Sequence, residues 1–360
     1  MKRAVICVTH PERYISKLPE YSIMIINPDA MPTRRQYLLE NSDWSLLITN
    51  TEIKTRDGGD YPNERLFWYT SGTTGDSKFC SFTQLQVDNL ANTIRTAYKL
   101  TDNDRYVSIM PLWHAHGQGV YWAAQQAGCE INFLKVKDIR SMPEYHPTFI
   151  TAIPDVLNVV ADLKFDGLRF IRSASAPLPN KLYKHLLDQH GVPIIEAFGM
   201  TEALSHCFTN PLEGEQRIGT IGLPSGITAR INNNGHLFIQ GLNVYVNDWF
   251  DTGDLAEQDE RGYYKILGRS NDQINIRGVK INPASLEKQL LESISGLQEC
   301  VVFGTDTVKC LYVGNCTNLN IVNFLKTLGP YCIPKFIQQV DAVPLSPSGK
   351  ISRVWLDTKY

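Results

Sequence analysis

The chain has 360 residues, of which 43% are hydrophobic, and its 35 basic residues face 37 acidic ones for a formal net charge of −2. This length predicts about two domains, and the charge balance gives no electrostatic reason to expect nucleic acid as a partner. No apolar run approaches the roughly 18 residues that a membrane helix needs, and the start MKRAVICVTHPERY lacks the long apolar stretch of a signal peptide. We therefore expect no membrane partner.

Eight cysteines are scattered along the chain, without a C-x-x-C pair and without histidines at metal-ligand spacing. This usage is typical of reduced thiols rather than of a disulfide framework or a zinc site. We therefore expect a cytoplasmic protein.

Residues 1–200 alternate short apolar segments with helical patterns. RAVICV, SIMIIN, WSLLIT and RLFWYT indicate strands, residues 83–100 indicate an amphipathic helix, and the alternation continues from RYVSIM to VPIIEAF. This pattern predicts an α/β fold with a mostly parallel, helix-covered sheet. Ligands of such sheets lie at the carboxyl ends of the strands.

The pattern changes twice after residue 205. Glycine turns and short strands first predict a small β-rich subdomain, and a compact α+β unit begins near residue 270. In that unit, Asn282 is a good N-cap for a helix with Pro283 at its first position. We predict a large domain over residues 1–269 and a small, mobile domain over residues 270–360.

The segment YTSGTTGDSK (residues 69–78) directly follows the predicted strand RLFWYT. Its glycines and hydroxyl side chains are suited to a phosphate-binding loop, and Lys78 adds a positive charge. A Walker A loop is excluded, because Gly72 and Gly75 are too close together and Phe79 follows the lysine. A turn rich in serine and threonine is the alternative.

Four later segments complete a pattern: EAFGMTEA (196–203), DWFDTGDL (248–255), GRSNDQINIRGVKINP (268–283) and PLSPSGKISR (344–353). With the loop, these five ordered motifs resemble those of the adenylate-forming superfamily, which comprises acyl- and aryl-CoA synthetases, peptide-synthetase adenylation domains and luciferases. The loop matches that family's Y-T-S-G-T-T-G-x-P-K, except that Ser77 replaces the proline and Phe79 the following glycine.

The resemblance implies an enzyme that activates a carboxylic acid with ATP, releases pyrophosphate and passes the acyl group to a thiol. That thiol belongs to CoA or to the phosphopantetheine of a carrier protein. Glu202 would hold Mg²⁺, which prefers carboxylate oxygen, and Thr201 would donate to the α-phosphate. The β- and γ-phosphates would be held by Thr70, Ser71, Gly72, Thr73, Thr74 and Lys78.

The resemblance also implies the nucleoside contacts. Phe198, beside Gly199, would offer adenine an aromatic face, although the family commonly has tyrosine there. Asp254 would accept hydrogen bonds from both ribose hydroxyls, with Arg269 nearby; a turn role in TGD is the alternative. The other adenine face would be lined by Ser175, Ala176 and Pro177, unless these form an ordinary strand-to-helix loop.

Two residues of the small domain are implicated in the same way. Lys350 would bridge the substrate carboxylate and the α-phosphate, where it would stabilise the negative charge of the transition state; a lysine in a solvated tail is the alternative. Gly278 lies where pantetheine passes close to the backbone in the family. Any tight turn could equally explain that glycine.

The segment PLWHAHGQG (111–119) matches the family's P-[LM]-[FY]-H-x-x-G, and His114 fits the gate of an acyl or aryl pocket. A packed histidine without a substrate role is the alternative. We consider His116 a weaker candidate. Relatives that activate amino acids generally have an aspartate here, so the lack of an acid disfavours that substrate class. Trp113 is a candidate for lining the pocket.

Only 68 residues precede Tyr69, fewer than is usual in the family. We expect the chain to begin partway into the family's first subdomain, and a homodimer would cover the exposed surface. The leading hypothesis is a CoA ligase for a small carboxylic acid, and the second is a ligase that loads a carrier protein. A non-catalytic adenylate-binding protein is disfavoured, because such a protein would not need the catalytic residues. The chain retains all of them: Lys78, Glu202, Asp254, Arg269 and Lys350.

Overall fold

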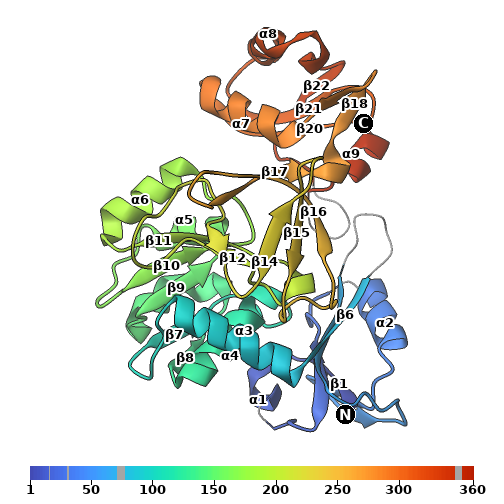
Figure 1. The fold of residues 1–360 in the computed structure, drawn as a ribbon, viewed down its shortest axis with the longest axis vertical. Helices are drawn as coiled ribbons and strands as arrows, with labels where there is room; N and C mark the ends of the chain where they lie inside the picture. The colour runs from blue at the N-terminus through green and yellow to red at the C-terminus, as the bar shows by residue number, and fades with distance from the viewer. Residues whose placement is uncertain (16, 31, 71–77, 345–350) are drawn as a thin grey trace.

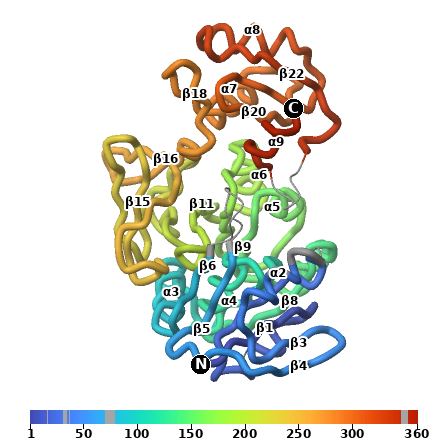
Figure 2. The backbone as a smooth tube through the Cα atoms, turned by 90° about the vertical axis from the view of Figure 1, so that its right-hand side faces the viewer, coloured from blue at the N-terminus to red at the C-terminus, as the bar shows by residue number. Residues whose placement is uncertain are grey.

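The structure is a computed structural model that describes residues 1–360 except residues 16, 31, 71–77 and 345–350. Two large sheets and a smaller antiparallel sheet form the lower part of Figure 1, and a separate α+β unit lies above them. The N-terminus lies with the first sheet at one end of the long axis, and the C-terminus lies in the α+β unit at the other end, as Figure 2 also shows.

The first sheet has six strands in the order β4-β3-β1-β2-β5-β6. Its inner strands are parallel, while β4 and β6 pair antiparallel at the two edges. The strands are β1 (Lys2–Cys7), β2 (Tyr21–Ile25), β3 (Leu46–Thr49), β4 (Ile53–Thr55), β5 (Glu64–Thr70) and β6 (Lys78–Thr83), and the helices inserted among them are α1 (Glu12–Ile15) and α2 (Pro32–Asn41).

The second sheet has seven strands in the order β13-β12-β11-β10-β9-β7-β8, and its five strands from β11 to β8 are parallel. These strands are β7 (Arg105–Ser108), β8 (Glu130–Phe133), β9 (Phe149–Ala152), β10 (Phe170–Ser173), β11 (Ile194–Phe198), β12 (Phe208–Thr209) and β13 (Leu223–Pro224). The accompanying helices are α3 (Gln84–Ala97), α4 (Ala115–Ala127), the 3₁₀ segment η1 (Val136–Tyr145), α5 (Pro154–Val160) and α6 (Asn180–His190).

Alternation along the strands arranges these elements in layers. In β1, Ala4 and Ile6 pack toward α3 and α4, whereas Val5 and Cys7 pack toward α2 on the opposite face. The α3–α4 pair is also packed against the second sheet, so the largest apolar cluster fills the space between the two sheets. The other face of the second sheet is covered by α5, α6 and η1.

Two further units complete the chain. The antiparallel sheet contains β14 (Thr228–Ile231), β15 (His236–Gln240), β16 (Phe250–Gln258) and β17 (Tyr264–Arg269). The α+β unit contains η3 (Ser270–Asp272), β18 (Ile274–Ile276), β19 (Val279–Ile281), α7 (Pro283–Ser293), β20 (Leu297–Phe303), β21 (Lys309–Gly314), α8 (Asn318–Leu328), η4 (Pro330–Cys332), β22 (Phe336–Gln339) and α9 (Arg353–Lys359).

This architecture confirms the predicted fold class: a large α/β part with a β-rich subdomain, followed by a small α+β unit. Asn282 caps α7 as predicted, since its side chain accepts from the Ser285 N–H at 3.4 Å. The boundary at residues 269 and 270 falls between β17 and η3 and stays a prediction. Within the described part of the chain, no helix combines the length and apolarity that a membrane crossing requires.

Candidate active site

Two predicted site segments lie side by side at the carboxyl edge of the second sheet. Residues 175–177 follow β10, and residues 198–202 end β11 and continue into the 3₁₀ turn η2 (Thr201–Ala203). The strands β10 and β11 are parallel neighbours, with Ile171 opposite Ile194. The sheet therefore brings the predicted adenine segment close to the predicted metal-binding segment.

Backbone packing fixes the segment after β11. A Cβ atom on Gly199 would collide with the backbone of Ser205, so this close approach requires glycine. Phe198 is half-buried and packs edge-on against Phe208, with ring centroids 6.1 Å apart. The glycine that we predicted as a nucleotide contact therefore also has a structural explanation.

Glu196 was not singled out by the sequence analysis. Its carboxylate accepts a hydrogen bond from the Gly219 N–H at 2.6 Å and another from the Leu178 N–H, and burial raises its pKa. Glu196 thus ties the segment after β10 to β11 and to the loop at Gly219. A lone acid inside the apolar strand VPIIEAF was the available signal.

Glu202 is held through its backbone, and its carboxylate is left available. Its carbonyl accepts a hydrogen bond from the Tyr245 N–H at 2.9 Å. Among the described residues, the Glu202 carboxylate has no hydrogen-bond or ion-pair partner. One carboxylate with the phosphates of a nucleotide is the donor set that Mg²⁺ commonly uses; the described residues contain no cluster of three metal ligands.

Asp254 is the most deeply buried of the predicted site carboxylates. It lies on β16 and is only 3% exposed, and its Oδ1 pairs with the Arg269 Nε at 2.8 Å across the β16–β17 ladder. Burial raises the pKa of Asp254 to about 6, although the Arg269 charge and the nearby Thr252 hydroxyl oppose this shift. The Thr252 hydroxyl donates its hydrogen to the Leu237 carbonyl at 3.0 Å, so it does not satisfy the carboxylate. The Asp254 Oδ2 is buried and has no hydrogen-bond partner among the described residues. A buried acceptor of this kind is unfavourable until a donor reaches it.

The second sheet and the β-rich subdomain meet near the buried Cys207 thiol. Burial raises the pKa of the Cys207 thiol to about 12, and both Glu202 and Asp254 add to this shift. The two carboxylates therefore act on the same buried thiol from two different elements. Arg269 is anchored by a second hydrogen bond, from Nη1 to the Thr252 carbonyl at 3.0 Å.

The predicted acid-pocket segment forms the start of α4, with His114 at the N-cap position. A Cβ on Gly117 would collide with the Met110 and Pro111 carbonyls, and one on Gly119 would collide with Ser205 Oγ. The glycines of HAHGQG therefore let the first turns of α4 approach both the preceding loop and the segment after β11.

His116, which the sequence analysis considered less promising, is only 6% exposed and lies in a polar network. Its Nδ1 is 3.1 Å from Ser175 Oγ, and its Nε2 is 2.9 Å from both Thr151 Oγ1 and Arg172 Nη1. Arg172 was not singled out from the sequence. We call Arg172, His116, Thr151 and Ser175 the Arg172 centre.

Several predicted residues lie elsewhere or outside the described residues. Gly278 forms the turn of the β18–β19 hairpin in the α+β unit, with φ of +87° and open space at its Cβ position. The backbones of Thr70 and Lys78 pair across the β5–β6 ladder. Outside the described residues are Ser71, Gly72, Thr73, Thr74 and Lys350.

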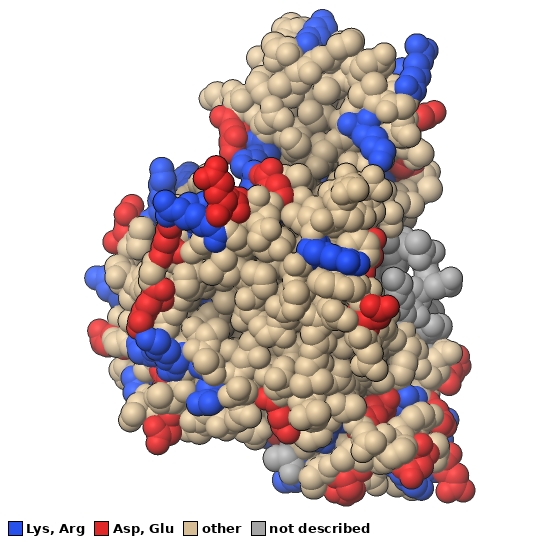
Figure 3. All heavy atoms as spheres, viewed as in Figure 1, with Lys and Arg blue, Asp and Glu red and all other residues tan. Residues whose placement is uncertain are grey.

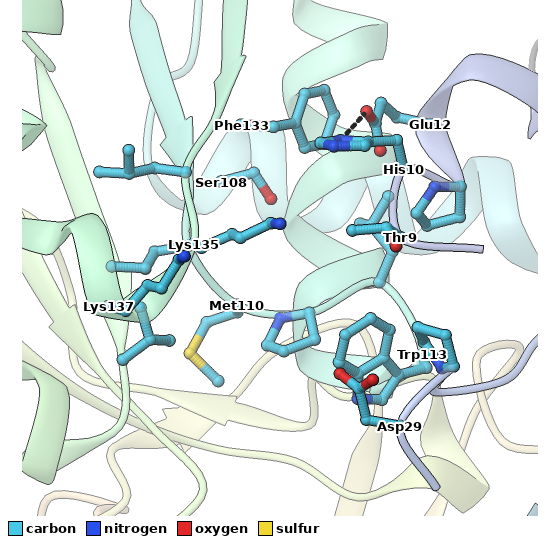
Figure 4. Close-up of a pocket in the computed structure, with 17 residues that line it drawn as sticks. Thr9, His10, Glu12, Asp29, Ser108, Met110, Trp113, Phe133, Lys135 and Lys137 are labelled. Carbon is cyan, nitrogen blue, oxygen red and sulfur yellow. Dashed lines mark ion pairs between the residues drawn. The ribbon is translucent and has the colours of Figure 1, made fainter. Parts of the chain in front are cut away.

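A pocket of about 410 Å³ opens where the first and second sheets meet (Figure 4). Lys135 reaches into it from the segment after β8, and His10, Glu12 and Asp29 lie on the opposite wall, with His10 and Glu12 paired at 3.2 Å. Trp113 also lines this pocket, which therefore reaches the back of the PLWHAHGQG segment.

The surface charges show no segregation by sign on the face that Figure 3 presents, where basic and acidic side chains are intermixed.

Comparison with known proteins supplies the class of the chain. Residues 60–243 match the family described as AMP-binding enzyme, which is more than half of the chain. The chain belongs to this family, the adenylate-forming superfamily that its five motifs resemble.

The chain is also similar to individual CoA ligases. The chain is 32% identical over 340 residues to oxalate–CoA ligase from Arabidopsis thaliana, covering 80% of this chain and 66% of the relative. It is 28% identical over 336 residues to sulfoacetate–CoA ligase from Cupriavidus necator, covering 81% and 66%. The chain thus spans just under two thirds of the length of these relatives.

A solved structure shows the same fold. The ATP-bound crystal structure of MatB from Rhodopseudomonas palustris matches with a TM-score of 0.87 at 19% identity, covering 100% of this chain and 88% of that one.

Proposed function

We propose that the chain is an acid–thiol ligase that adenylates a small carboxylic acid with ATP and then transfers the acyl group to CoA. The observation that carries this proposal is the buried Asp254 carboxylate, whose Oδ2 has no partner among the described residues while its Oδ1 is fixed by Arg269. A pair of ribose hydroxyls would supply the missing donors. Asp254 and Arg269 would thus fix the sugar beside the edge that carries residues 175–177.

The proposed reaction has two steps. An oxygen of the substrate carboxylate attacks the α-phosphorus of ATP, the bond from that phosphorus to the bridging oxygen of the β-phosphate breaks, and pyrophosphate leaves. The thiol sulfur of CoA then loses its proton and attacks the acyl carbon, and AMP leaves. Thr201 is assigned to the α-phosphate, and the loop of residues 70–78 to the leaving pyrophosphate.

The carboxylate of Glu202 is the proposed protein ligand for Mg²⁺, which neutralises charge on the phosphates when bound. Its freedom from other partners in the described part of the chain supports this role. His114, at the start of α4, is proposed to border the acid pocket together with Trp113.

CoA is favoured as the thiol because the named relatives are CoA ligases, acting on oxalate and on sulfoacetate. A carrier-protein phosphopantetheine is the second candidate, and Gly278 is proposed to border the passage of either thiol. All eight cysteines lie among the described residues and none forms a disulfide, and we propose the cytoplasm as the compartment. A homodimer is a further proposal that size-exclusion chromatography with light scattering would test.

The test is acid-dependent exchange of labelled pyrophosphate into ATP, measured with a panel of carboxylic acids. We expect exchange with at least one acid, followed by thioester formation when CoA is added. Absence of exchange with every acid would contradict the proposal. If a thioester formed only with holo carrier proteins, the acceptor would be a carrier protein and not CoA.

Lys350 is proposed to act only in the first step, and the small domain to move so that different residues serve the second. We expect Lys350→Ala to lower exchange by about 10²–10³-fold, because it removes charge stabilisation from the transition state. The variant should still bind ATP and convert preformed acyl-adenylate to thioester. Normal exchange by Lys350→Ala would refute its role, and a matched Lys335→Ala variant controls for loss of a lysine from the same unit.

A further inference from the structure

Arg172 is a buried cation without a carboxylate partner. Its side chain, on β10, is only 1% exposed. Its Nε donates to Tyr98 Oη at 2.9 Å, and its Nη1 donates to Thr151 Oγ1 at 3.1 Å and to His116 Nε2 at 2.9 Å. All three acceptors are neutral, and no carboxylate of the described residues forms an ion pair with Arg172.

The surrounding histidines do not balance this charge. Burial lowers the pKa of His116 well below its usual value and that of His206 to about 3, and the Arg172 charge adds to both shifts. Both rings are therefore neutral near pH 7, and the centre keeps one net positive charge. A buried guanidinium without an anionic partner is unfavourable in a folded protein, so an anion that reached this centre would be stabilised by its charge.

The hydrogen bonds of the Arg172 centre determine which atom donates and which accepts at each step from Arg172 to Ser175. Arginine can only donate, so His116 Nε2 must be the acceptor and the ring proton must be on Nδ1. That proton is then donated to Ser175 Oγ over 3.1 Å. The hydroxyl hydrogen of Ser175 is consequently free to be donated to a group outside the centre.

Ser175 is placed to use that donor. It is exposed at the carboxyl edge of the second sheet, in contrast to the buried Arg172 and His116. Its φ of +72° lies in the left-handed region, where a residue with a Cβ is strained. Strain of this kind is concentrated at ligand-binding positions in proteins. The buried charge therefore reaches the candidate site through one histidine and one serine.

The centre is built onto the element that starts at the proposed acid pocket. His116 lies in the first turn of α4, two residues after His114. The same helix packs through Gly119 against Ser205, in the segment after β11. The Arg172 centre thus joins the edge of the sheet to the acid side of the site.

Given the proposed function, on which this inference rests, we propose that the preferred acid carries a second anionic group, and that Ser175, backed by His116 and Arg172, receives it. The ligand class is a short dicarboxylate or an equivalent dianion. Ser175, which the resemblance assigned to the adenine face together with Ala176 and Pro177, would instead donate to an oxygen of the second group. The Arg172 charge would offset the negative charge brought into the site.

A phosphate oxygen of the nucleotide would offer the same anionic chemistry from another source. We assign the centre to the acid because, among the described residues, its hydrogen-bonded path to the exposed Ser175 runs through His116 of α4, the helix that begins next to His114. In addition, the loop at residues 70–78 and Glu202 already serve the phosphates in the proposed function. The experiment separates the two sources by measuring acid selectivity and the KM for ATP independently.

The experiment is pyrophosphate exchange with acids matched in carbon number: oxalate against acetate, malonate against propionate, and succinate against butyrate. We expect at least one dianion to exceed its matched monoanion in kcat/KM by about 100-fold or more, because a site built for a charged group rejects the analogue that lacks it. Equal or better use of the monoanions would overturn the inference.

Variants then test which residues produce the preference for dianions. Arg172→Met should reduce the ratio between the matched acids to less than about threefold, with little change in the KM for ATP. Ser175→Ala retains the buried network and should reduce the ratio by about fivefold to tenfold, which keeps the test decisive if Arg172→Met folds poorly. Arg169→Met is the matched control, since Arg169 lies just before β10 but pairs with Asp104, and it should leave the ratio unchanged.

Three outcomes count against the inference. An equal loss with both acid classes would make Arg172 a structural residue, and a raised KM for ATP with an unchanged acid ratio would assign the anion to the nucleotide. If no acid supports exchange, calorimetric titration with oxalate, malonate and succinate decides. Binding that is lost in Arg172→Met would uphold the anion site while the proposed function fails, and absence of binding would reject both.

Discussion

Arg3 in the first sheet and Arg172 in the second are both buried, at 6% and 1% exposure, but their surroundings differ. Arg3 forms a two-pronged pair with Glu64, with Nε–Oε1 at 2.8 Å and Nη2–Oε2 at 3.0 Å, and its guanidinium stacks 3.5 Å from the Tyr61 ring centroid. Arg172 has only neutral partners. The chain can thus provide a buried arginine with a carboxylate, which makes the incomplete centre in the second sheet informative.

A similar contrast holds for carboxylates. Glu64 has both oxygens paired with Arg3, whereas Asp254 has one oxygen paired with Arg269 and one without a partner among the described residues. Arg3 and Glu64 thus complete each other in the first sheet, whereas, in the described part of the chain, Arg172 on β10 lacks an opposite charge and one oxygen of Asp254 on β16 lacks a hydrogen-bond donor. Arg65 on β5 is a third arrangement, since its guanidinium donates to the Leu18 and Tyr21 carbonyls. Incomplete buried groups are expected where a ligand supplies the remaining contacts.

The largest expected effect comes from breaking the complete pair. Arg3→Met should lower the free energy of unfolding by about 3–5 kcal/mol, because it leaves the Glu64 carboxylate buried without its cation. Urea denaturation would measure this loss. Arg172→Met leaves no buried carboxylate without its cation, so the free energy of unfolding should stay unchanged or rise.

Two results would contradict this contrast. The double variant Arg3→Met/Glu64→Leu should regain most of the lost stability, because an apolar pair of similar volume replaces the ion pair. Failure to regain it would mean that packing of the Arg3 side chain, rather than its charge, stabilises the sheet. A loss in Arg172→Met as large as that in Arg3→Met would make the two arginines equivalent.

The next largest effect is expected for Asp254→Asn, which should raise the stability of the free protein and weaken its binding of adenosine. Asp254→Asn removes a carboxylate whose pKa is raised to about 6 by burial. Since one pKa unit corresponds to about 1.4 kcal/mol, the free protein should gain about 1–3 kcal/mol at pH 7.5. Adenosine affinity should fall at least about tenfold, because the amide is a weaker acceptor for ribose hydroxyls. Thermal unfolding and calorimetry on the same sample check both signs, and a loss of stability would reject the assignment.

Much of the fold could be predicted from the sequence, because its signals are local. The alternating apolar segments correctly indicated β1, β2, β3 and β5, and the Asn282–Pro283 pair correctly marked the start of α7. The edge strand β6 was missed, although the inward-facing Cys80 and Phe82 alternate with more exposed neighbours. No strand was predicted there, because this period-2 pattern spans only a few residues.

The site could be predicted only in part. The motifs pointed to Glu202, Asp254 and Arg269 through the resemblance, since these residues lie in recognisable segments, and their roles stay predictions. The Arg172 centre could not be found in this way, because Arg172 and His116 come from elements 56 residues apart in sequence. Nothing local distinguishes a buried unpaired arginine from a solvated one at the end of a strand.

A moderate effect follows from the titration of Asp254. Its folded-state pKa of about 6 exceeds that of the unfolded chain, so the folded state holds the proton more tightly. The contribution of this group to stability is therefore fully present below pH 4 and is lost as pH rises through 6. Binding has the opposite dependence, because only the carboxylate accepts from both hydroxyls: adenosine affinity should fall up to about tenfold per unit below pH 6. Adenosine has no titrating phosphate, and Asp254→Asn should abolish this dependence.

The smallest effect uses a second ion pair on the same two strands. Glu257 and Lys265 face each other across β16 and β17, as Asp254 and Arg269 do, and their side chains pair at 2.6 Å with roughly half of their surface exposed. Exposed pairs contribute little to stability, so Lys265→Met should change the free energy of unfolding by less than about 0.5 kcal/mol and leave adenosine affinity unchanged. If Lys265→Met instead weakened adenosine binding as much as Asp254→Asn, the geometry of the β16–β17 ribbon, and not the unpartnered Asp254 oxygen, would determine nucleoside binding.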